Sequence, residues 1–415
     1  MSSIGLRRVL IVVENLPVPL DRRVWLEATA LTEAGYQVSV LAPKGRGWTA
    51  DHEVIDGVHC YRYPEPPEAH DGAVAYAREY LHALWHWFRL MPKIRRERGF
   101  DVIQGCNPPD LVFLLAWLYR PFGVRYLFDH HDVCPELYEA KFGRRGFFHK
   151  VMLWWERLTF ATASVSIATN ESFRRIALTR GKMAPEDVFV VRSAPRLENF
   201  IPGPGDRARR KGAKTLLGYV GVIGQQEGMD LMVEAIDQVI RRHGHEDLHV
   251  MVVGFGPHLE VVQADVRARG LDAWFTFTGP LFGADLVEAL NAIDIGLSPD
   301  PKNAMNDIST MNKIMEYMTL EKPSVQFDLT EGRASAAGAS LYARANDPAD
   351  FADQIARLIE DPQLGEELGR IGRDRVRELL NWSRSVPALL AAYDRIYAKS
   401  GPVPAPVRKE AQLPR

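Results

Sequence analysis

Residues 7–45, RRVLIVVENLPVPLDRRVWLEATALTEAGYQVSVLAPKG, contain a strand, a helix and a second strand. A buried β-branched run comes first, followed by a proline-rich loop and then by Val24, Ala28 and Leu31 at helical spacing. Apolar runs on either side of an amphipathic helix are typical of a βαβ unit, whose two strands are parallel. The stretch therefore predicts the beginning of an open parallel sheet.

The same alternation continues through both halves of the chain. Further strands are expected at residues 102–104, 126–128, 164–168, 215–220, 249–253, 275–278, 295–297 and 324–327. Helical patterns separate them, which indicates an α/β fold with two Rossmann-like, doubly wound parallel sheets. Two such sheets that face each other put the carboxyl ends of their strands on either side of a central cleft.

The 415 residues are too many for one hydrophobic core, so two domains are expected. Residues 194–210 hold three prolines and end in a cluster of charges, as a linker does. We expect an N-terminal domain at 1–198, a C-terminal domain at 199–382, and a helix at 383–400 that crosses back to the first domain. The tail, 401–415, has four prolines and is expected to be disordered.

Composition excludes several classes of protein. The formal net charge of -2 gives no overall attraction to nucleic acid, and no such partner is expected. The three cysteines, Cys60, Cys106 and Cys134, lack CxxC spacing and favour a reducing cytoplasm. The chain begins with no signal-peptide pattern and holds no apolar stretch of about 20 residues, so we expect it to be cytoplasmic and not integral to a membrane.

Two stretches of the second half have the features of an anion site. MVVGFGPHLEVV places Gly254 and Gly256 between a strand and a helix, where bare N–H groups approach phosphate or sugar oxygens; a tight turn without ligand is the alternative. The third glycine of a dinucleotide-binding GxGxxG motif is missing. A polar loop, 300–312, then leads into a helix near Asn312, whose N-terminus favours an anion.

In that helix, Glu316 lies one turn after Lys313 and is suited to accept hydrogen bonds from vicinal hydroxyls such as those of ribose. A solvated loop with Glu316 facing water is the alternative.

These motifs follow one another in a definite order. YVG, VVGFGP, FTG, ALNAIDIGLSPD and a Lys-x-x-Glu-Tyr-Met helix followed by KPSV extend from Leu217 to about Val325. In this order the chain resembles family-4 glycosyltransferases, retaining enzymes of the two-domain GT-B fold. The resemblance implies transfer of a hexosyl-type sugar from a nucleotide diphosphate donor to a glycan or polyprenyl-diphosphate-linked acceptor, in bacterial surface-polysaccharide synthesis, without a metal ion or other cofactor.

The resemblance assigns donor binding residue by residue. Glu316 matches the glutamate that binds the donor ribose, and Gly254 matches the turn beside the nucleotide. Thr278 and Gly279 match the stretch that contacts the base, and residues 306–312 the loop that holds the diphosphate and the sugar. The expected donor-binding set is Gly221, Gly254, Gly256, Thr278, Gly279, Asn312, Lys313 and Glu316.

The chain departs from the family pattern at three positions. Val222 and Glu227 replace the cations that bind the diphosphate, and Ile308 replaces the first of two glutamates eight residues apart. The diphosphate must then be held otherwise. The candidates are Lys313, Arg192, Lys302 and Arg333 for the diphosphate, and Asp307 for the sugar hydroxyls.

In the first half, YLFDHHDVCPELYEAKF places Asp129, His130, His131 and Asp132 after a strand, on the cleft side. An imidazole there can bind a donor sugar hydroxyl or position the acceptor. The family has an active-site histidine at this place, and His131 matches it better than His130; a histidine that only joins loop backbone is the alternative. The expected catalytic set is His131, Asp132, Lys313 and Asp307.

The same string also invites two other interpretations. Carboxylates and imidazoles bind zinc or manganese, but neighbouring residues of a strand point to opposite sides, and no metal site is predicted. A likeness to DHH phosphoesterases is not supported, because the further aspartate clusters of those enzymes are missing.

The loop ENLPVPLDRRVWLEA places Asp21, Arg22 and Arg23 at the start of the first helix. In the family this loop borders the acceptor and the diphosphate. Arginine at a helix start opposes the helix dipole, so we expect an anionic partner across the cleft; a solvent-facing pair is the alternative.

AREYLHALWHWFRLMPKIRRER and AKFGRRGFFHKVMLWWERL combine aromatic residues with clustered arginines, and residues 78–98 hold six basic and two acidic residues. Such stretches rest on an anionic membrane or belong to the core. Aromatic faces of this kind belong more often to the core, and a peripheral contact with the inner face of the plasma membrane is the alternative.

The expected mechanism binds the donor in the second domain and the acceptor in the first, and closure of the cleft excludes water. No carboxylate stands out as a covalent nucleophile, so front-face attack assisted by the departing phosphate fits retention. Two other functions stay open: a nucleotide-sugar 2-epimerase of the same fold, and a non-catalytic nucleotide-sugar-binding partner of a polysaccharide assembly complex.

Overall fold

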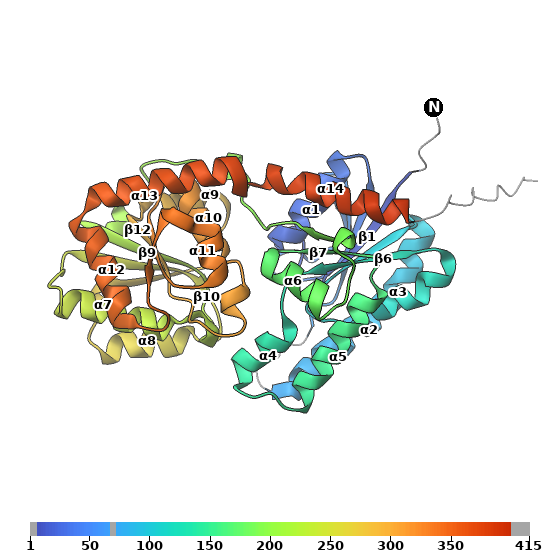
Figure 1. The fold of residues 1–415 in the computed structure, drawn as a ribbon, viewed down its shortest axis with the longest axis horizontal. Coiled ribbons are helices and arrows are strands. Elements are labelled where there is room, and N and C mark those ends of the chain that lie inside the picture. Colours follow the sequence, from blue (N-terminus) through green and yellow to red (C-terminus); the bar gives the residue numbers. More distant parts are fainter. Residues whose placement is uncertain (1–5, 67–71, 400–415) are drawn as a thin grey trace, which may run out of the picture.

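The computed structural model describes residues 6–66 and 72–399, which form one sheet in each half of the chain (Figure 1). The expected tail at 401–415 lies outside the described residues. The domain boundaries expected from the sequence, after residues 198 and 382, remain a proposal.

The first sheet has eight strands, and all neighbouring pairs are parallel except the hairpin at one edge. In spatial order they are β3 (His52–Ile55), β4 (Val58–Tyr63), β2 (Gln37–Pro43), β1 (Arg8–Val12), β5 (Val102–Cys106), β6 (Arg125–His130), β7 (Val165–Ala168) and β8 (Val188–Val190).

Helices cover both faces of this sheet. They are α1 (Arg22–Glu33), α2 (Gly72–Glu97), α3 (Phe113–Tyr119) with the 3-10 turn η1 (Arg120–Phe122), α4 (Cys134–Phe142), α5 (Phe147–Thr162) and α6 (Glu171–Thr179). Successive side chains of a strand point to opposite faces, so Val9 and Ile11 pack with α1, whereas Leu10 and Val12 pack with α2, α3 and α5.

The second sheet is entirely parallel. Its order is β11 (Phe275–Gly279), β10 (Leu248–Phe255), β9 (Thr215–Val222), β12 (Ile295–Ser298), β13 (Ser324–Phe327) and β14 (Ser340–Ala343). Its helices are α7 (Met229–Arg241), α8 (Leu259–Ala268), α9 (Gly283–Ala292), α10 (Asn312–Thr319), α11 (Thr330–Ala336), α12 (Pro348–Glu360) and α13 (Pro362–Arg375).

The predicted fold class is confirmed: two doubly wound parallel sheets, one in each half. The sequence did not predict four strands, β3, β4, β8 and β14. Strands β3, β8 and β14 are edge strands, where pairing on one side and partial burial leave a weak apolar pattern. Strand β4 lies next to β3, and His59 and Arg62 interrupt its apolar run.

Helix α14 (Trp382–Ala398) returns to the first half, as predicted, and forms the long red helix along one side of Figure 1. Leu389, Ala392, Tyr393 and Ile396 are buried in the same cluster as Val9 and other residues of the first sheet. The last helix of the chain is therefore part of the N-terminal core.

Leu389→Ala should lower the free energy of unfolding by about 2–5 kcal/mol, because Leu389 is fully buried and truncation leaves a cavity between α14 and the first sheet. Chemical denaturation measures the loss. Arg384→Ala, an exposed position of the same helix, is the control and should change stability by less than about 0.5 kcal/mol. Equal effects of both changes would contradict a core role for α14.

Candidate active site

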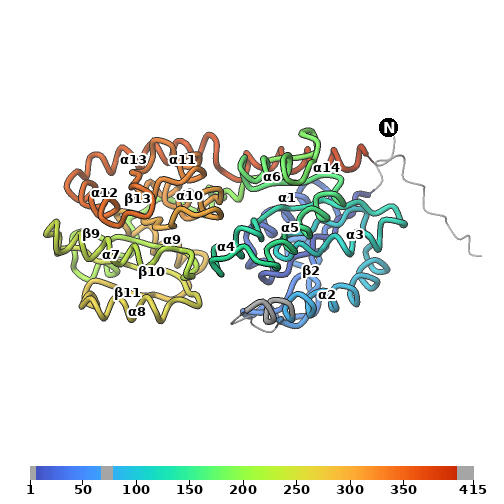
Figure 2. Tube along the Cα trace, turned by 60° about the horizontal axis from the view of Figure 1, so that its bottom comes forward, coloured from blue at the N-terminus to red at the C-terminus, as the bar shows by residue number. Residues whose placement is uncertain are grey.

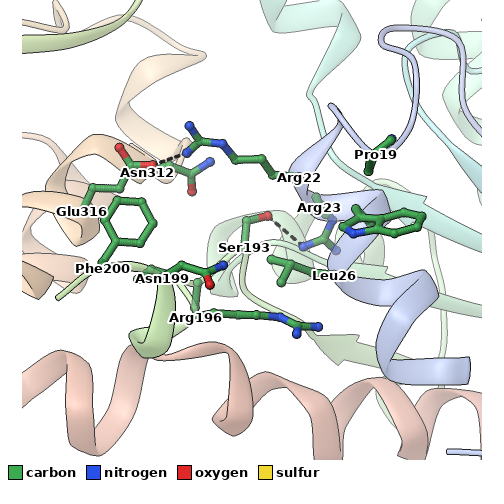
Figure 3. Close-up of a pocket in the computed structure, with 13 residues that line it drawn as sticks. Pro19, Arg22, Arg23, Leu26, Ser193, Arg196, Asn199, Phe200, Asn312 and Glu316 are labelled. Atoms are coloured by element: carbon green, nitrogen blue, oxygen red, sulfur yellow. Dashed lines mark hydrogen bonds and ion pairs between the residues drawn. The ribbon is translucent and has the colours of Figure 1, made fainter. Parts of the chain in front are cut away.

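An ion pair joins the two halves where their strands end. Arg22, at the start of α1, donates to the carboxylate of Glu316 in α10 (Figure 3). The Glu316 side chain is 8% exposed and that of Arg22 is 57% exposed. Asp21 caps α1 by accepting a 3.1 Å hydrogen bond from Val24 N–H, and Arg22 follows this cap directly.

Arg22 and Glu316 line a cavity of about 240 Å³ between the halves. Its other walls come from α1, from Asn312 and from the linker. The lining residues are Pro19, Arg22, Arg23, Trp25, Leu26, Ser193, Ala194, Pro195, Arg196, Asn199, Phe200, Asn312 and Glu316. Sequence reasoning missed Arg196, Asn199 and Phe200, because a stretch with prolines and charges was interpreted only as a linker.

Phe200 brings an aromatic ring from the linker to this cavity. It also packs against a buried cluster of the second half that includes Leu290 and Tyr317. Glu316 and Asn312 therefore share one cavity with an aromatic side chain.

Close packing in the second sheet explains why several positions of the expected donor set are glycine. Gly221 and Gly254 are register partners with φ of 155° and 149°, and a Cβ on Gly254 would lie 1.9 Å from the Gly221 carbonyl oxygen. A Cβ on Gly256 would lie 2.3 Å from the Ile223 carbonyl oxygen. Side chains are thus excluded at these turns for steric reasons, whether or not a ligand binds there.

Thr278 and Gly279 end the neighbouring strand β11, where Gly279 has a φ of 73°. The Thr278 hydroxyl donates to the Gly279 carbonyl over 2.8 Å. Because β9, β10 and β11 are parallel neighbours, the donor-set glycines and Thr278 gather at the carboxyl edge of one sheet.

Lys313, expected to bind a diphosphate, is buried and already paired. Its Nζ lies 2.9 Å from the Asp300 carboxylate, 3.7 Å from Glu227 and 4.7 Å from the centre of the Tyr219 ring. Burial raises the pKa of Glu227 to about 7, with Lys313 opposing and Asp300 adding to the rise. The ammonium therefore faces two acidic groups, and the role predicted for Lys313 stays a prediction.

The remaining candidates around this loop also have partners. Asp307 accepts from the Thr330 N–H over 2.9 Å and from its hydroxyl over 3.1 Å, which ties the turn η7 (Asn306–Ile308) to α11. Ion pairs join Lys302 to Asp307, Arg192 to Glu331 and Arg333 to Asp328.

In the first half, a buried hydrogen-bond network surrounds the carboxylate of Asp129. Arg23 lies 2.7 Å from it, Gln104 Nε2 donates over 3.0 Å, and His131 Nε2 lies 2.6 Å away. Burial alone would raise the pKa of Asp129, but Arg23 and His131 hold it far below its usual value. Arg23 and His131 thus favour the ionised form of Asp129, and its carboxylate orients the imidazole.

The loop around His131 is held by one amide. Asn107 Oδ1 accepts from the main-chain N–H groups of His131, over 2.7 Å, and of Asp132, over 3.1 Å. Burial raises the pKa of the Asp132 carboxyl. Asn107 was not singled out in the sequence, because its partners lie more than twenty residues away.

His130 has a different environment. It is fully buried against the rings of Phe128, Phe160 and Phe173, and burial lowers its pKa to about 3. Neither ring nitrogen has a hydrogen-bond partner. Of the two adjacent histidines, only His131 therefore takes part in the polar network.

Among the described residues, one group of metal-capable side chains comes together: Cys106, Asp129 and His131, with ligand atoms within 4.8 Å of one another. Arg23 and Gln104 already donate to Asp129, and burial raises the pKa of the Cys106 thiol. The arginine supplies the positive charge at this point, so the donor set does not favour a cation.

Known proteins share both the sequence patterns and this fold. Residues 20–194 match the family described as glycosyl transferase 4-like domain, and residues 214–361 match glycosyl transferases group 1. The chain belongs to the glycosyltransferases. Its two matched regions contain most of the site residues of the two halves, Arg22 and His131 in the first and Lys313 and Glu316 in the second.

The relatives of this glycosyltransferase are distant. The 2-deoxystreptamine glucosyltransferase of Streptomyces kanamyceticus is 25% identical over 321 residues, which cover 74% of this chain and 80% of the relative. The sucrose-phosphate synthase (tll1590) of Thermosynechococcus elongatus has the same fold, with a TM-score of 0.78 at 18% identity over 95% of this chain and all of that one. Anabaena Alr3699/HepE in complex with UDP-glucose gives a TM-score of 0.70 at 14% identity, over 93% and 99% of the two chains.

Arg23→Ala should lower the free energy of unfolding by about 3–5 kcal/mol, because it leaves the buried Asp129 carboxylate without its cation. Arg22→Ala, the matched control one residue earlier, should lower it by about 1 kcal/mol or less, because its side chain is more than half exposed. Urea denaturation of both variants measures the difference. Similar losses of unfolding free energy in the two variants would contradict a buried role for Arg23 and an exposed role for Arg22.

Proposed function

We propose that this glycosyltransferase binds a nucleoside diphosphate sugar in its second half and transfers the sugar to an acceptor that lies against the first half. The observation that carries the proposal is Glu316, a nearly buried carboxylate in α10 that opens onto a cavity lined by both halves. Such a carboxylate has two oxygens that suit the vicinal hydroxyls of a ribose.

Arg22 is the cation best placed to compensate for the missing positive charges. Val222, at one of the family's cationic positions, is 50% exposed, and Glu227 occupies the other. When a ribose takes the Glu316 carboxylate, Arg22 loses its partner and its exposed guanidinium becomes free for the diphosphate. The donor site is then completed by a residue from the opposite half.

The leaving diphosphate would be stabilised by this cation and by the N-terminus of α10, so no metal ion or other cofactor is required. His131, fixed on Asp129 through Nε2, keeps Nδ1 for a hydroxyl of the donor sugar or the acceptor. We propose retention by front-face attack, with cleft closure to exclude water.

The names of related proteins narrow the donors and acceptors to test. One relative is named a glucosyltransferase, and Alr3699/HepE was solved with UDP-glucose, so UDP-hexoses are the first donor class to screen. For the acceptor we propose a glycan or a polyprenyl-diphosphate-linked glycan of a cell-surface polysaccharide.

Calorimetric titration of the purified chain with a panel of nucleotide sugars tests donor binding. We expect binding of an intact nucleoside diphosphate sugar without added magnesium, and a loss of roughly 1–3 kcal/mol in binding free energy in Glu316→Ala, from the hydrogen bonds to a charged group. Glu288→Ala, an exposed carboxylate on α9, is the matched control. Binding that depends on magnesium, or that is unaffected in Glu316→Ala, would contradict the site.

Proton NMR of the product reports the anomeric configuration and therefore tests retention. Inversion would refute front-face attack. Release of a free, epimerised donor in the absence of acceptor would instead identify a 2-epimerase.

Donor affinity should fall as the pH rises from about 6 to about 8, because Glu227, whose pKa is raised to about 7, then loses its proton beside the diphosphate position. Glu227→Gln should bind more tightly above pH 7 and lose this pH dependence. Calorimetry at several pH values measures both effects. The same slope in wild type and Glu227→Gln would rule out Glu227 as its source.

A further inference from the structure

Three helical segments of the first half expose large apolar side chains outward. On α2 they are Leu81, Trp85 and Phe88, on α3 and η1 they are Trp117, Leu118 and Phe122, and on α5 they are Phe147, Phe148 and Trp154. Seven of these nine side chains are phenylalanine or tryptophan, whereas Phe282 is the single exposed residue of these two types in the described part of the second half. The other large apolar side chains exposed there are aliphatic: Ile201, Val222, Val261, Ile371 and Leu379. Concentration on one region, rather than exposure of single residues, marks an interaction surface.

The three segments form one surface. The Arg95 guanidinium of α2 lies 5.2 Å from the centre of the Phe122 ring of η1. Trp117 Nε1 of α3 donates to the Thr162 hydroxyl of α5 over 2.9 Å. Their inner faces share one buried cluster, and both views show α2, α3 and α5 grouped on the first half (Figures 1 and 2). We call their outer side the α2–α3–α5 face.

Helix α2 carries three stripes of side chains: a buried apolar stripe, an exposed apolar stripe and an exposed basic stripe. The buried stripe, which points to the core, consists of Ala83, Trp87, Met91 and Ile94. The exposed apolar stripe consists of Leu81, Trp85 and Phe88, which are spaced by four and three residues. That spacing puts the exposed apolar residues on one line along the helix.

Arg89, Lys93 and Arg96 follow the same four-and-three spacing and are also exposed. The guanidinium of Arg89 lies 5.4 Å from the Trp85 ring, so the basic stripe borders the apolar one. Of the two acids in residues 78–98, Glu97 accepts from Tyr61 over 3.0 Å, and Glu79 lies beside Glu14. The outer side of α2 is thus apolar and positive, the combination found in helices that lie in a membrane interface.

A groove extends this pattern from α2 to η1. Its volume is about 420 Å³, and it is lined by Pro92, Arg95, Arg96, Leu118, Tyr119 and Phe122. Two guanidinium groups beside apolar walls suit a lipid phosphate with its adjoining chains.

A helix that lies on the membrane surface differs from an anchor helix that crosses the bilayer. In residues 6–66 and 72–399, no helix has both the length and the apolar character that crossing a bilayer requires.

We propose that the α2–α3–α5 face docks on the surface of an anionic lipid bilayer, with its aromatic residues at the headgroup level and its basic stripe against lipid phosphates. Charge complementarity favours an anionic bilayer as the partner, because the face has exposed aromatic side chains beside the cations of α2 and of the groove. The docking is independent of the sugar donor, and a lipid-linked acceptor would be presented to the half of the enzyme that rests on the bilayer.

Sedimentation with vesicles of phosphatidylglycerol and phosphatidylcholine in equal parts tests the docking. We expect the wild-type chain to sediment with these vesicles, to stay in solution with pure phosphatidylcholine, and to bind less as salt increases. Arg89→Glu combined with Arg96→Glu should weaken binding by about tenfold or more. Trp85→Ser combined with Phe122→Ser should weaken it even at low salt.

Val261→Ser combined with Arg267→Glu, on exposed positions of α8 in the second half, is the matched control and should bind like the wild type. Calorimetric donor titration of each variant separates a docking defect from a defect of the donor site. Equal binding to neutral and anionic vesicles, no binding by wild type, or equal weakening by the α8 control would overturn the proposal. A dimer in analytical ultracentrifugation that Trp85→Ser dissociates would also overturn it, because a second copy would then cover the face.

Discussion

The buried carboxylate of Asp129 is the constraint on which the first half depends. A charge with no exposed surface is tolerated only when cations and hydrogen-bond donors surround it. Arg23 from α1, Gln104 from β5 and His131 after β6 meet that requirement, and Tyr393 of α14 donates to Gln104 over 2.5 Å. One ionised group thus connects a helix, two strands and the returning C-terminal helix to the candidate catalytic histidine.

The start of α1 divides its two arginines between core and cleft. Arg23 turns inward, where it pairs with Asp129 and donates to the Ser193 hydroxyl over 3.0 Å, whereas Arg22 reaches Glu316 in the other half (Figure 3). Arg23 keeps its partner because the pair is buried in a low-dielectric environment, whereas Arg22 is exposed to water and can exchange partners. The first half therefore presents one buried, paired arginine to its core and one exposed arginine to the cleft.

Contacts between the halves are both apolar and polar. Met305 and Ile308 of the second half pack against a buried cluster of the first half that includes Val133 and Phe173. Asn170 Nδ2 donates to the Ile308 carbonyl over 2.9 Å, and the Ser172 hydroxyl donates to Glu331 over 2.6 Å. The second half is not strongly cationic at its own site, because Asp300 and Glu227 surround Lys313. In the proposed mechanism a diphosphate held there needs positive charge from the first half, and donor binding is coupled to closure of the cleft.

The sequence by itself determined the two parallel sheets, the return of the last helix and the turns at which the expected donor-binding residues gather. These features depend on short-range periodicity and on motifs of a few residues, and both involve residues that are close together in the sequence. Only the tertiary structure decided which charges are free. Arg23 meets Asp129 more than one hundred residues away, Lys313 meets Asp300 across a loop, and Phe200 enters the cavity from a stretch that had no periodic pattern. Pairing and burial depend on groups that only folding brings together, and they set whether a side chain keeps its charge for a ligand.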